Sequence, residues 1–350
     1  MMKPILGVIE GFFGRDWGAS GRAQTLPMLA REGYGLYVYA PKSDRVLRQD
    51  WRVPFGPGHI RELVQLRARC VTAGIGFGIG LTPYGLDATD WQAERRFLTQ
   101  KLSQIKALEP DWLCLLFDDT PGGEMGLAGL HLRAAEVALE ASVAPQVALC
   151  PAYYSDDPIL DQVFGARPDG YLEALGQGLA SEVDIFWTGP KVVSTSLDPE
   201  YLDGVAERLG RKPLIWDNGA VNDSRALSPF LPLDPAVERG LPLADHVSGL
   251  LVNPINQPGL AQLPLAKIAR QWRGRAATFG EIAEAYAGPD LAAMLAADLA
   301  TFSAAGFDAL APLQRAALTS RYAPYADYPI ARDILDWLAG GYVFDPACLT

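Results

Sequence analysis

Two adjacent aspartates, Asp118 and Asp119, directly follow the apolar run WLCLLF (112–117). Two carboxyl groups side by side at the end of a buried strand repel each other and lose hydration. One of them should therefore keep its proton to a higher pH than a free aspartic acid. A carboxyl group with that property can serve as a general acid. A helix N-cap, a Mg²⁺ site and a solvated turn are the alternative interpretations of the pair.

The elements that must position this pair follow from a repeated pattern. Short apolar runs recur about every 30 to 40 residues, with amphipathic helical stretches between them, as in parallel βα units. Each run is nearly continuous in apolar residues, which is typical of strands covered on both faces. We predict strands at 4–10, 35–40, 75–81, 112–117, 146–150, 183–187, 213–217 and 249–253, and helices including 21–33, 58–74, 89–108 and 127–142.

Eight βα units in succession predict the α/β class and a (β/α)8 TIM barrel with a small C-terminal helical appendage. A doubly wound open sheet is the alternative, although no GxGxxG motif follows the first run. The last βα unit ends near Trp272, and alanine-rich helical segments follow at 281–288, 290–302 and 331–341. We expect a catalytic barrel over 1–275 and a helical segment over 276–350 that docks on it, because no low-complexity linker separates them.

Polar residues accumulate after the predicted strands, where a barrel of this kind builds its site. Amides and carboxylates with few positive charges between them favour a neutral, polyhydroxylated ligand over a phosphate. Lys42 and Lys191 are either solvated or, as in an aldolase, able to form a Schiff base. Asn222 fits a turn or a cap. The residues at these strand ends are Glu10, Gly11, Lys42, Tyr153, Tyr154, Thr188, Lys191, Asp217, Asn218, Asn222, Asp223 and Asn253.

Aromatic residues near the same strand ends suit the C–H face of a sugar ring. For Phe13 and Trp187, packing in the core is the favoured interpretation. The full set is Phe12, Phe13, Trp17, Tyr154, Trp187 and Trp216.

Composition excludes several classes of partner. A formal charge of −11, from 41 acidic and 30 basic residues, offers no positive surface for nucleic acid or anionic membrane. No apolar run approaches the roughly 20 residues of a membrane helix, and MMKPILGVIEGFFG lacks the regions of a signal peptide. The four cysteines have no CxxC spacing and the three histidines are isolated, so we predict a cytoplasmic protein without a metal or cofactor.

Several motifs resemble glycoside hydrolase family 84, the O-GlcNAcases and related β-N-acetylglucosaminidases. They occur in the family's order and cover roughly residues 5–257. The stretches are GVIEGFFGRDW (7–17), YVYAPKSD (37–44), WR (51–52), FGIGLTP (77–83), LFDD (116–119), CPAYY (150–154), WTGPKVVS (187–194), WDNGAVND (216–223) and NPINQ (253–257).

The resemblance implies a role for individual residues. Asp118 would bind and orient the substrate's acetamido N–H, and Asp119 would protonate the leaving oxygen and later activate water. The implied sugar-hydroxyl ligands are the Gly11 carbonyl, Lys42, Asp223 and Asn253; Tyr154 and Asn218 would surround the acetamido group, and Trp216 and Cys150 would form its pocket wall.

The implied reaction is removal of a terminal β-linked N-acetylglucosamine from a glycoprotein or oligosaccharide, with retention of configuration. The substrate's own acetamido oxygen would attack C1 and form an oxazoline. A non-catalytic N-acetylglucosamine-binding protein on the same barrel is the alternative. The family usually has an aromatic residue where this chain has Ser224. Ser224 therefore distinguishes the outer rim of this chain, and with it the choice of aglycone, from the family's pattern.

Overall fold

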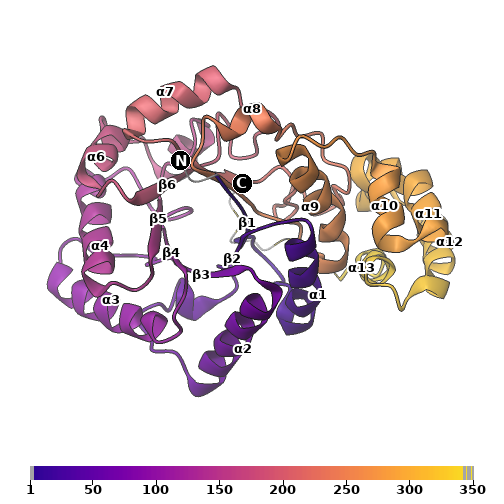
Figure 1. Cartoon of the computed structure of the whole chain (residues 1–350), viewed down its shortest axis with the longest axis horizontal. Coiled ribbons are helices and arrows are strands. Elements are labelled where there is room, and N and C mark those ends of the chain that lie inside the picture. The colour runs from indigo at the N-terminus through magenta and orange to yellow at the C-terminus, as the bar shows by residue number, and fades with distance from the viewer. Residues whose placement is uncertain (1–3, 342–343, 345–347, 349–350) are drawn as a thin grey trace.

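The computed structural model describes residues 4–341, 344 and 348. Within them, eight parallel strands close into a barrel in chain order (Figure 1). β8 pairs with β1 in the register Ile5–Gly249 to Val8–Val252, so the sheet has no edge. The predicted TIM barrel is confirmed and the open-sheet alternative is wrong. The strands are β1 (Ile5–Glu10), β2 (Leu36–Tyr39), β3 (Gly76–Leu81), β4 (Trp112–Leu116), β5 (Gln146–Cys150), β6 (Val183–Trp187), β7 (Leu214–Asp217) and β8 (Gly249–Val252).

Helices surround the barrel and cover the outer face of its strands (Figure 1). Their starts follow local capping chemistry. Asp90 caps α3, and Asp198 caps α7 by accepting from the backbone N–H of Glu200 at 2.9 Å. No helix in the described part of the chain has both the length and the apolarity to cross a membrane. The surrounding helices are α1 (Gly18–Arg31), α2 (Pro57–Ala73), α3 (Trp91–Lys106), α4 (Leu127–Ala141), α5 (Ile159–Phe164), α6 (Tyr171–Gly178), α7 (Pro199–Leu209), α8 (Leu241–Ala244) and α9 (Pro258–Trp272), with a 3₁₀ turn η1 (Arg45–Leu47).

The C-terminal helices gather beside α9 on one side of the barrel (Figure 1). In α13, Asp333 accepts hydrogen bonds from the backbone N–H groups of Gly259 (2.6 Å) and Leu260 (3.1 Å), which open α9. α12 is not among the predicted segments, because it buries little more than Leu318 and Tyr322 and so shows weak apolar periodicity. The division at 275/276 stays a prediction. The elements are α10 (Phe279–Ala287), α11 (Pro289–Ala300), a π turn η2 (Thr301–Ala305), a 3₁₀ turn η3 (Phe307–Ala309), α12 (Pro312–Tyr322), a 3₁₀ turn η4 (Ala323–Tyr325) and α13 (Pro329–Leu338).

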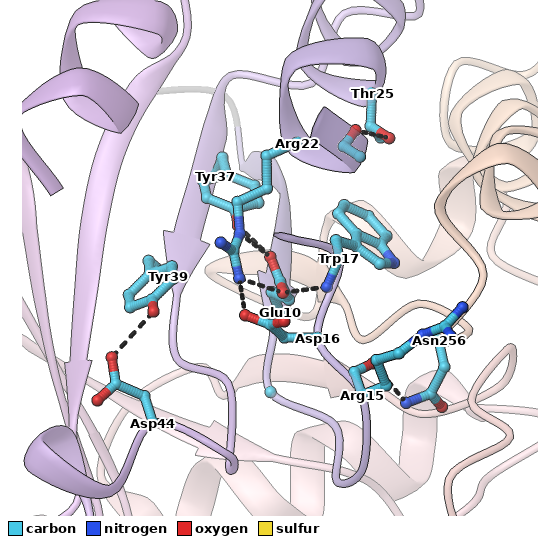
Figure 2. Close-up of polar contacts among 12 residues, drawn as sticks. Glu10, Arg15, Asp16, Trp17, Arg22, Thr25, Tyr37, Tyr39, Asp44 and Asn256 are labelled. Atoms are coloured by element: carbon cyan, nitrogen blue, oxygen red, sulfur yellow. Dashed lines mark hydrogen bonds and ion pairs between the residues drawn. The ribbon is translucent and has the colours of Figure 1, made fainter. Parts of the chain in front are cut away.

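Glu10, the last residue of β1, joins the barrel to its first helix (Figure 2). Its carboxylate is fully buried and accepts from the Arg22 guanidinium through both oxygens at 2.9 Å. The backbone N–H of Trp17 donates to it at 3.0 Å, and the Tyr37 hydroxyl donates as well. A buried carboxylate needs this degree of pairing to offset its lost hydration. The network fixes both ends of the loop over residues 11–16.

Candidate active site

A cavity of about 330 Å³ opens at the carboxyl ends of the strands. Its position agrees with the rule for this fold, and it draws side chains from loops far apart in the sequence. Lys42 does not line the cavity but contacts a residue that does. The other predicted site residues all line it: Gly11, Asp118, Asp119, Cys150, Tyr154, Trp216, Asn218, Asp223 and Asn253.

The aspartate pair is the charged centre of the cavity. The Lys42 ammonium donates to Asp118 Oδ2 and lies 4.0 Å from Asp119 Oδ2. The Tyr154 hydroxyl donates to Asp119 Oδ1 at 2.9 Å. Only 7% of the Asp118 side chain and 12% of the Asp119 side chain are exposed. The two carboxylates therefore sit in a largely desolvated setting with one cation between them.

The backbone at Asp119 is unusual. Its φ of +55° lies in the left-handed region, which few residues other than glycine adopt. The Thr120 hydroxyl donates to the Phe117 carbonyl at 2.5 Å and closes the turn that contains the pair. Arg48 donates to the Asp119 carbonyl at 3.2 Å. Such a conformation persists only where its surroundings hold it, and it occurs often at functional sites.

The electrostatic environment of Asp119 favours the protonated form of its carboxyl group. Burial raises the pKa of Asp119 above its usual range, and the neighbouring Asp118 charge raises it further, while Lys42 and the Tyr154 hydrogen bond oppose the shift. The direction agrees with the expectation for two neighbouring acids. Asp119 is thus suited to carry a proton.

Asp118 has an unused acceptor. Its Oδ1 is buried and has no hydrogen-bond partner among the described residues, although Oδ2 is paired with Lys42. A buried carboxylate oxygen without a donor is costly, and in a cavity wall it indicates a place where a ligand N–H or O–H would bind.

Amide side chains form the opposite wall. Asn218 Oδ1 accepts from the Trp216 indole and from the Asn253 amide, each at 2.9 Å. Asn253 Oδ1 accepts from the Gly11 backbone N–H at 3.2 Å, and Asn218 Nδ2 donates to the Val192 carbonyl at 2.9 Å. These bonds hold the ends of β1, β7 and β8 together and fix the plane of the Trp216 ring.

Asp223 borders the cavity from the loop that follows β7. Its carboxylate accepts from the backbone N–H of Phe13 at 2.8 Å. Burial raises its pKa to about 6, and the charge of Asp119 contributes in the same direction. This loop, residues 218–240, is longer than most connections in compact domains, as is common for loops that carry function.

Some residues predicted at the barrel mouth are used elsewhere. Asp217 is buried and paired with Arg239 at 2.8 Å. Asn222 donates to the Phe230 carbonyl and to Gln257, each at 3.0 Å, which fits its predicted turn role. Lys191 lines the cavity, but its side chain is 59% exposed and lies 3.6 Å from Asp157.

The aromatic residues divide between cavity and core. Trp187 is fully buried and its indole donates to Tyr201, as its core interpretation predicts. Phe13 is buried, as its core interpretation predicts, and it also lines the cavity through the loop after β1. Phe12 and Trp17 pack in the core.

A family model described as beta-N-acetylglucosaminidase matches residues 6–280. The chain belongs to this beta-N-acetylglucosaminidase family. The resemblance seen in the sequence motifs is thereby confirmed, and the match covers the barrel from Leu6 onward and the start of α10.

Two mammalian proteins are relatives of this chain. The protein O-GlcNAcases of Rattus norvegicus and Mus musculus are each 29% identical to it over 261 residues, which cover 71% of this chain and 28% of theirs. The chain thus spans less than a third of the length of these curated relatives. A mutant of the Thermobaculum terrenum O-GlcNAc hydrolase has a similar structure, with a TM-score of 0.76 at 23% identity, covering 94% of this chain and 73% of that one.

Some residues of the cavity wall were not predicted from the sequence. Asp157, Val192 and Leu227 line it from loops, and Arg48 lies behind Asp119. None of them follows a strand directly, which is the signal that found the others. Ser224, in place of the family's usual aromatic residue, is buried, and its hydroxyl accepts from the backbone N–H of Leu227 at 3.3 Å.

Proposed function

We propose that this protein is a retaining β-N-acetylglucosaminidase that removes terminal β-linked N-acetylglucosamine by substrate-assisted catalysis. One observation carries the proposal: Asp118 keeps a buried oxygen that no described donor reaches, beside a carboxyl group whose pKa is raised. The first matches what an acetamido N–H requires, and the second matches what a general acid requires. Family membership and the sequence motifs support the same substrate class.

In the proposed mechanism the substrate's acetamido oxygen attacks C1 while Asp119 protonates the glycosidic oxygen. Asp118 accepts the acetamido N–H, and the positive charge that develops on the amide strengthens this bond in the transition state. The C1–O bond to the aglycone breaks, and an oxazoline forms in its N-protonated state, with that N–H still hydrogen-bonded to Asp118. Asp119, now ionised, removes a proton from the water that opens the oxazoline, which restores both aspartates. No enzyme nucleophile is needed, so two adjacent carboxylates suffice.

The binding residues have matching places in this proposal. Asp223, Asn253 and the Gly11 carbonyl would hold sugar hydroxyls, while Lys42, which does not line the cavity, would act through its ion pair with Asp118. Tyr154, Asn218, Trp216 and Cys150 would surround the acetamido group. The lysine-aldolase alternative finds less support, because Lys42 is directed at Asp118 and does not line the cavity, and Lys191 is solvated.

The test compares 4-methylumbelliferyl N-acetyl-β-D-glucosaminide with the matching β-D-glucoside, which lacks the acetamido group. We expect turnover of the first and a rate at least about 1,000-fold lower for the second, because the internal nucleophile is missing. Equal rates would refute substrate assistance. Binding of N-acetylglucosamine without turnover of either substrate would favour the non-catalytic sugar-binding alternative.

Gly11 offers a steric test of the proposed pocket. A Cβ at this position would lie 2.4 Å from Cζ2 and 2.7 Å from Cη2 of Trp216, so the indole must shift. We expect Gly11→Ala to lower kcat/KM for the fluorogenic substrate by about 10- to 100-fold. Gly129→Ala is the matched control, since an added Cβ there has open space within helix α4, and its kcat/KM should stay at the wild-type value. A fully active Gly11→Ala variant would remove Trp216 from the pocket wall.

A further inference from the structure

Arg48 is a buried cation that the proposed mechanism does not yet use. It follows η1, is 5% exposed, and has no carboxylate partner among the ion pairs of the described residues. Its Nη2 donates to the Asp119 carbonyl at 3.2 Å, while its buried Nε reaches no acceptor in the described part of the chain. Burying a guanidinium with so few partners costs stability, which indicates a use for the charge.

Packing holds the Arg48 guanidinium in one place. Its central carbon lies 5.3 Å from the centre of the Phe13 ring and 5.0 Å from that of Tyr84. The backbone N–H of Thr82, after β3, donates to the Leu47 carbonyl at 2.8 Å and anchors the preceding residue. Arg48 thus bridges the loops after β1, β2 and β3 to the turn after β4, with cation–π contacts on the way.

Charge is unevenly distributed around Asp119. Asp118 and Asp223 add negative charge from the loops after β4 and β7, and Tyr154 donates a hydrogen bond from the loop after β5. Lys42 is the neighbouring cation, but it is directed at Asp118. Arg48 is therefore the second positive charge near a group surrounded by carboxylates.

We infer that Arg48 is a positioning residue for Asp119, which holds the left-handed turn presenting the carboxyl group and supplies the second cation beside it. The inference rests on the proposed role of Asp119 as the proton donor. It adds to that role a cause for the conformation. Asp119 has a φ of +55°, and the hydrogen bond from Arg48 to its carbonyl fixes the peptide unit that follows.

A change in pH dependence should follow. A cation near a carboxyl group favours the ionised form, and Arg48 lowers the pKa of Asp119 against the effect of burial. Without that cation the acid stays protonated to a higher pH. The descending limb of kcat/KM, where the general acid loses its proton, should therefore move to higher pH.

The experiment measures pH profiles of kcat and KM with 4-methylumbelliferyl N-acetyl-β-D-glucosaminide. For Arg48→Met we expect the descending limb to move up by about one pH unit and kcat at the optimum to fall about 10-fold or more, with KM nearly unchanged. Arg48→Lys keeps the positive charge, so the descending limb of kcat/KM should stay at the wild-type pH. Its kcat should still fall, because the guanidinium hydrogen bond to the Asp119 carbonyl is lost. If Arg48→Met does not fold, Arg48→Gln gives the same readout.

Arg52→Met is the matched control. Arg52 lies in the same segment, stacks on Trp51 at 4.5 Å and pairs with Glu94 at 2.6 Å, away from the aspartates. Its loss should lower the melting temperature and leave the limb in place. The inference is overturned if the descending limb of kcat/KM stays at the wild-type pH in the uncharged Arg48 variants. It is also overturned if the limb moves equally in Arg52→Met. Wild-type turnover in the same assay separates this failure from failure of the proposed function.

Discussion

Replacing Asp119 with Asn should lower kcat/KM by about 10²- to 10⁴-fold for glycosides with poor leaving groups, and much less for activated aryl glycosides. A poor leaving group depends on protonation as the C1–O bond breaks, whereas a nitrophenolate leaves without it. The substitution removes the proton and little else. Asn tolerates the left-handed backbone at this position, and its amide oxygen can still accept from the Tyr154 hydroxyl.

A series of aryl N-acetyl-β-glucosaminides with leaving groups of decreasing acidity measures this difference. The slope of log kcat/KM against leaving-group pKa should be steeper for Asp119→Asn than for the wild-type protein. The variant should also lose the descending limb of the pH profile, because that limb reports ionisation of Asp119. Equal losses across the series, or an unchanged limb, would exclude Asp119 as the acid.

The fold was predictable because each strand is a nearly continuous apolar run. The run at 112–117 is continuous since β4 packs on the barrel interior inside and on helices outside, and the residue type changes only where the strand ends. The polar residues directly after a strand were found for the same reason, including Asp118, Asp119 and Asn253. Their convergence is a property of the closed parallel sheet, whose strand ends all open on one face.

The use of each side chain was harder to predict, because it depends on partners distant in sequence. Glu10 and Asp217 stand at strand ends like the cavity residues, but Arg22 and Arg239 bind their carboxylates outside the cavity. Successive side chains of a strand point to opposite faces of the sheet. A shift of one residue along the strand therefore moves a side chain from the barrel interior to the helix layer. Arg48 reaches Asp119 across 71 positions, and no local pattern marks it.

Replacing Asp118 with Asn should weaken binding of a thiazoline mimic of the proposed oxazoline by about 10- to 100-fold. Both carboxylate oxygens of Asp118 can accept a hydrogen bond: Lys42 occupies Oδ2, and Oδ1 has no donor among the described residues. An asparagine turns its oxygen to Lys42 and leaves its NH2 facing the ligand. A thiazoline has an N–H only when its ring nitrogen is protonated. That cation meets the asparagine NH2 donor to donor, and the negative charge that favours the protonated form is gone.

Calorimetric titration of the thiazoline against Asp118→Asn and the wild-type protein tests this step apart from turnover. Asp157→Asn is the matched control: Asp157 also lines the cavity, but its carboxylate accepts from the backbone N–H groups of Ile159 and Val192 at 3.2 Å and is not joined to Lys42. The affinity of Asp157→Asn for the thiazoline should stay within about threefold of wild type, because this substitution removes no charge that faces the proposed acetamido position. Unchanged affinity in Asp118→Asn would mean that the acetamido arm is oriented by another group, and the unused oxygen of Asp118 would then need a different ligand.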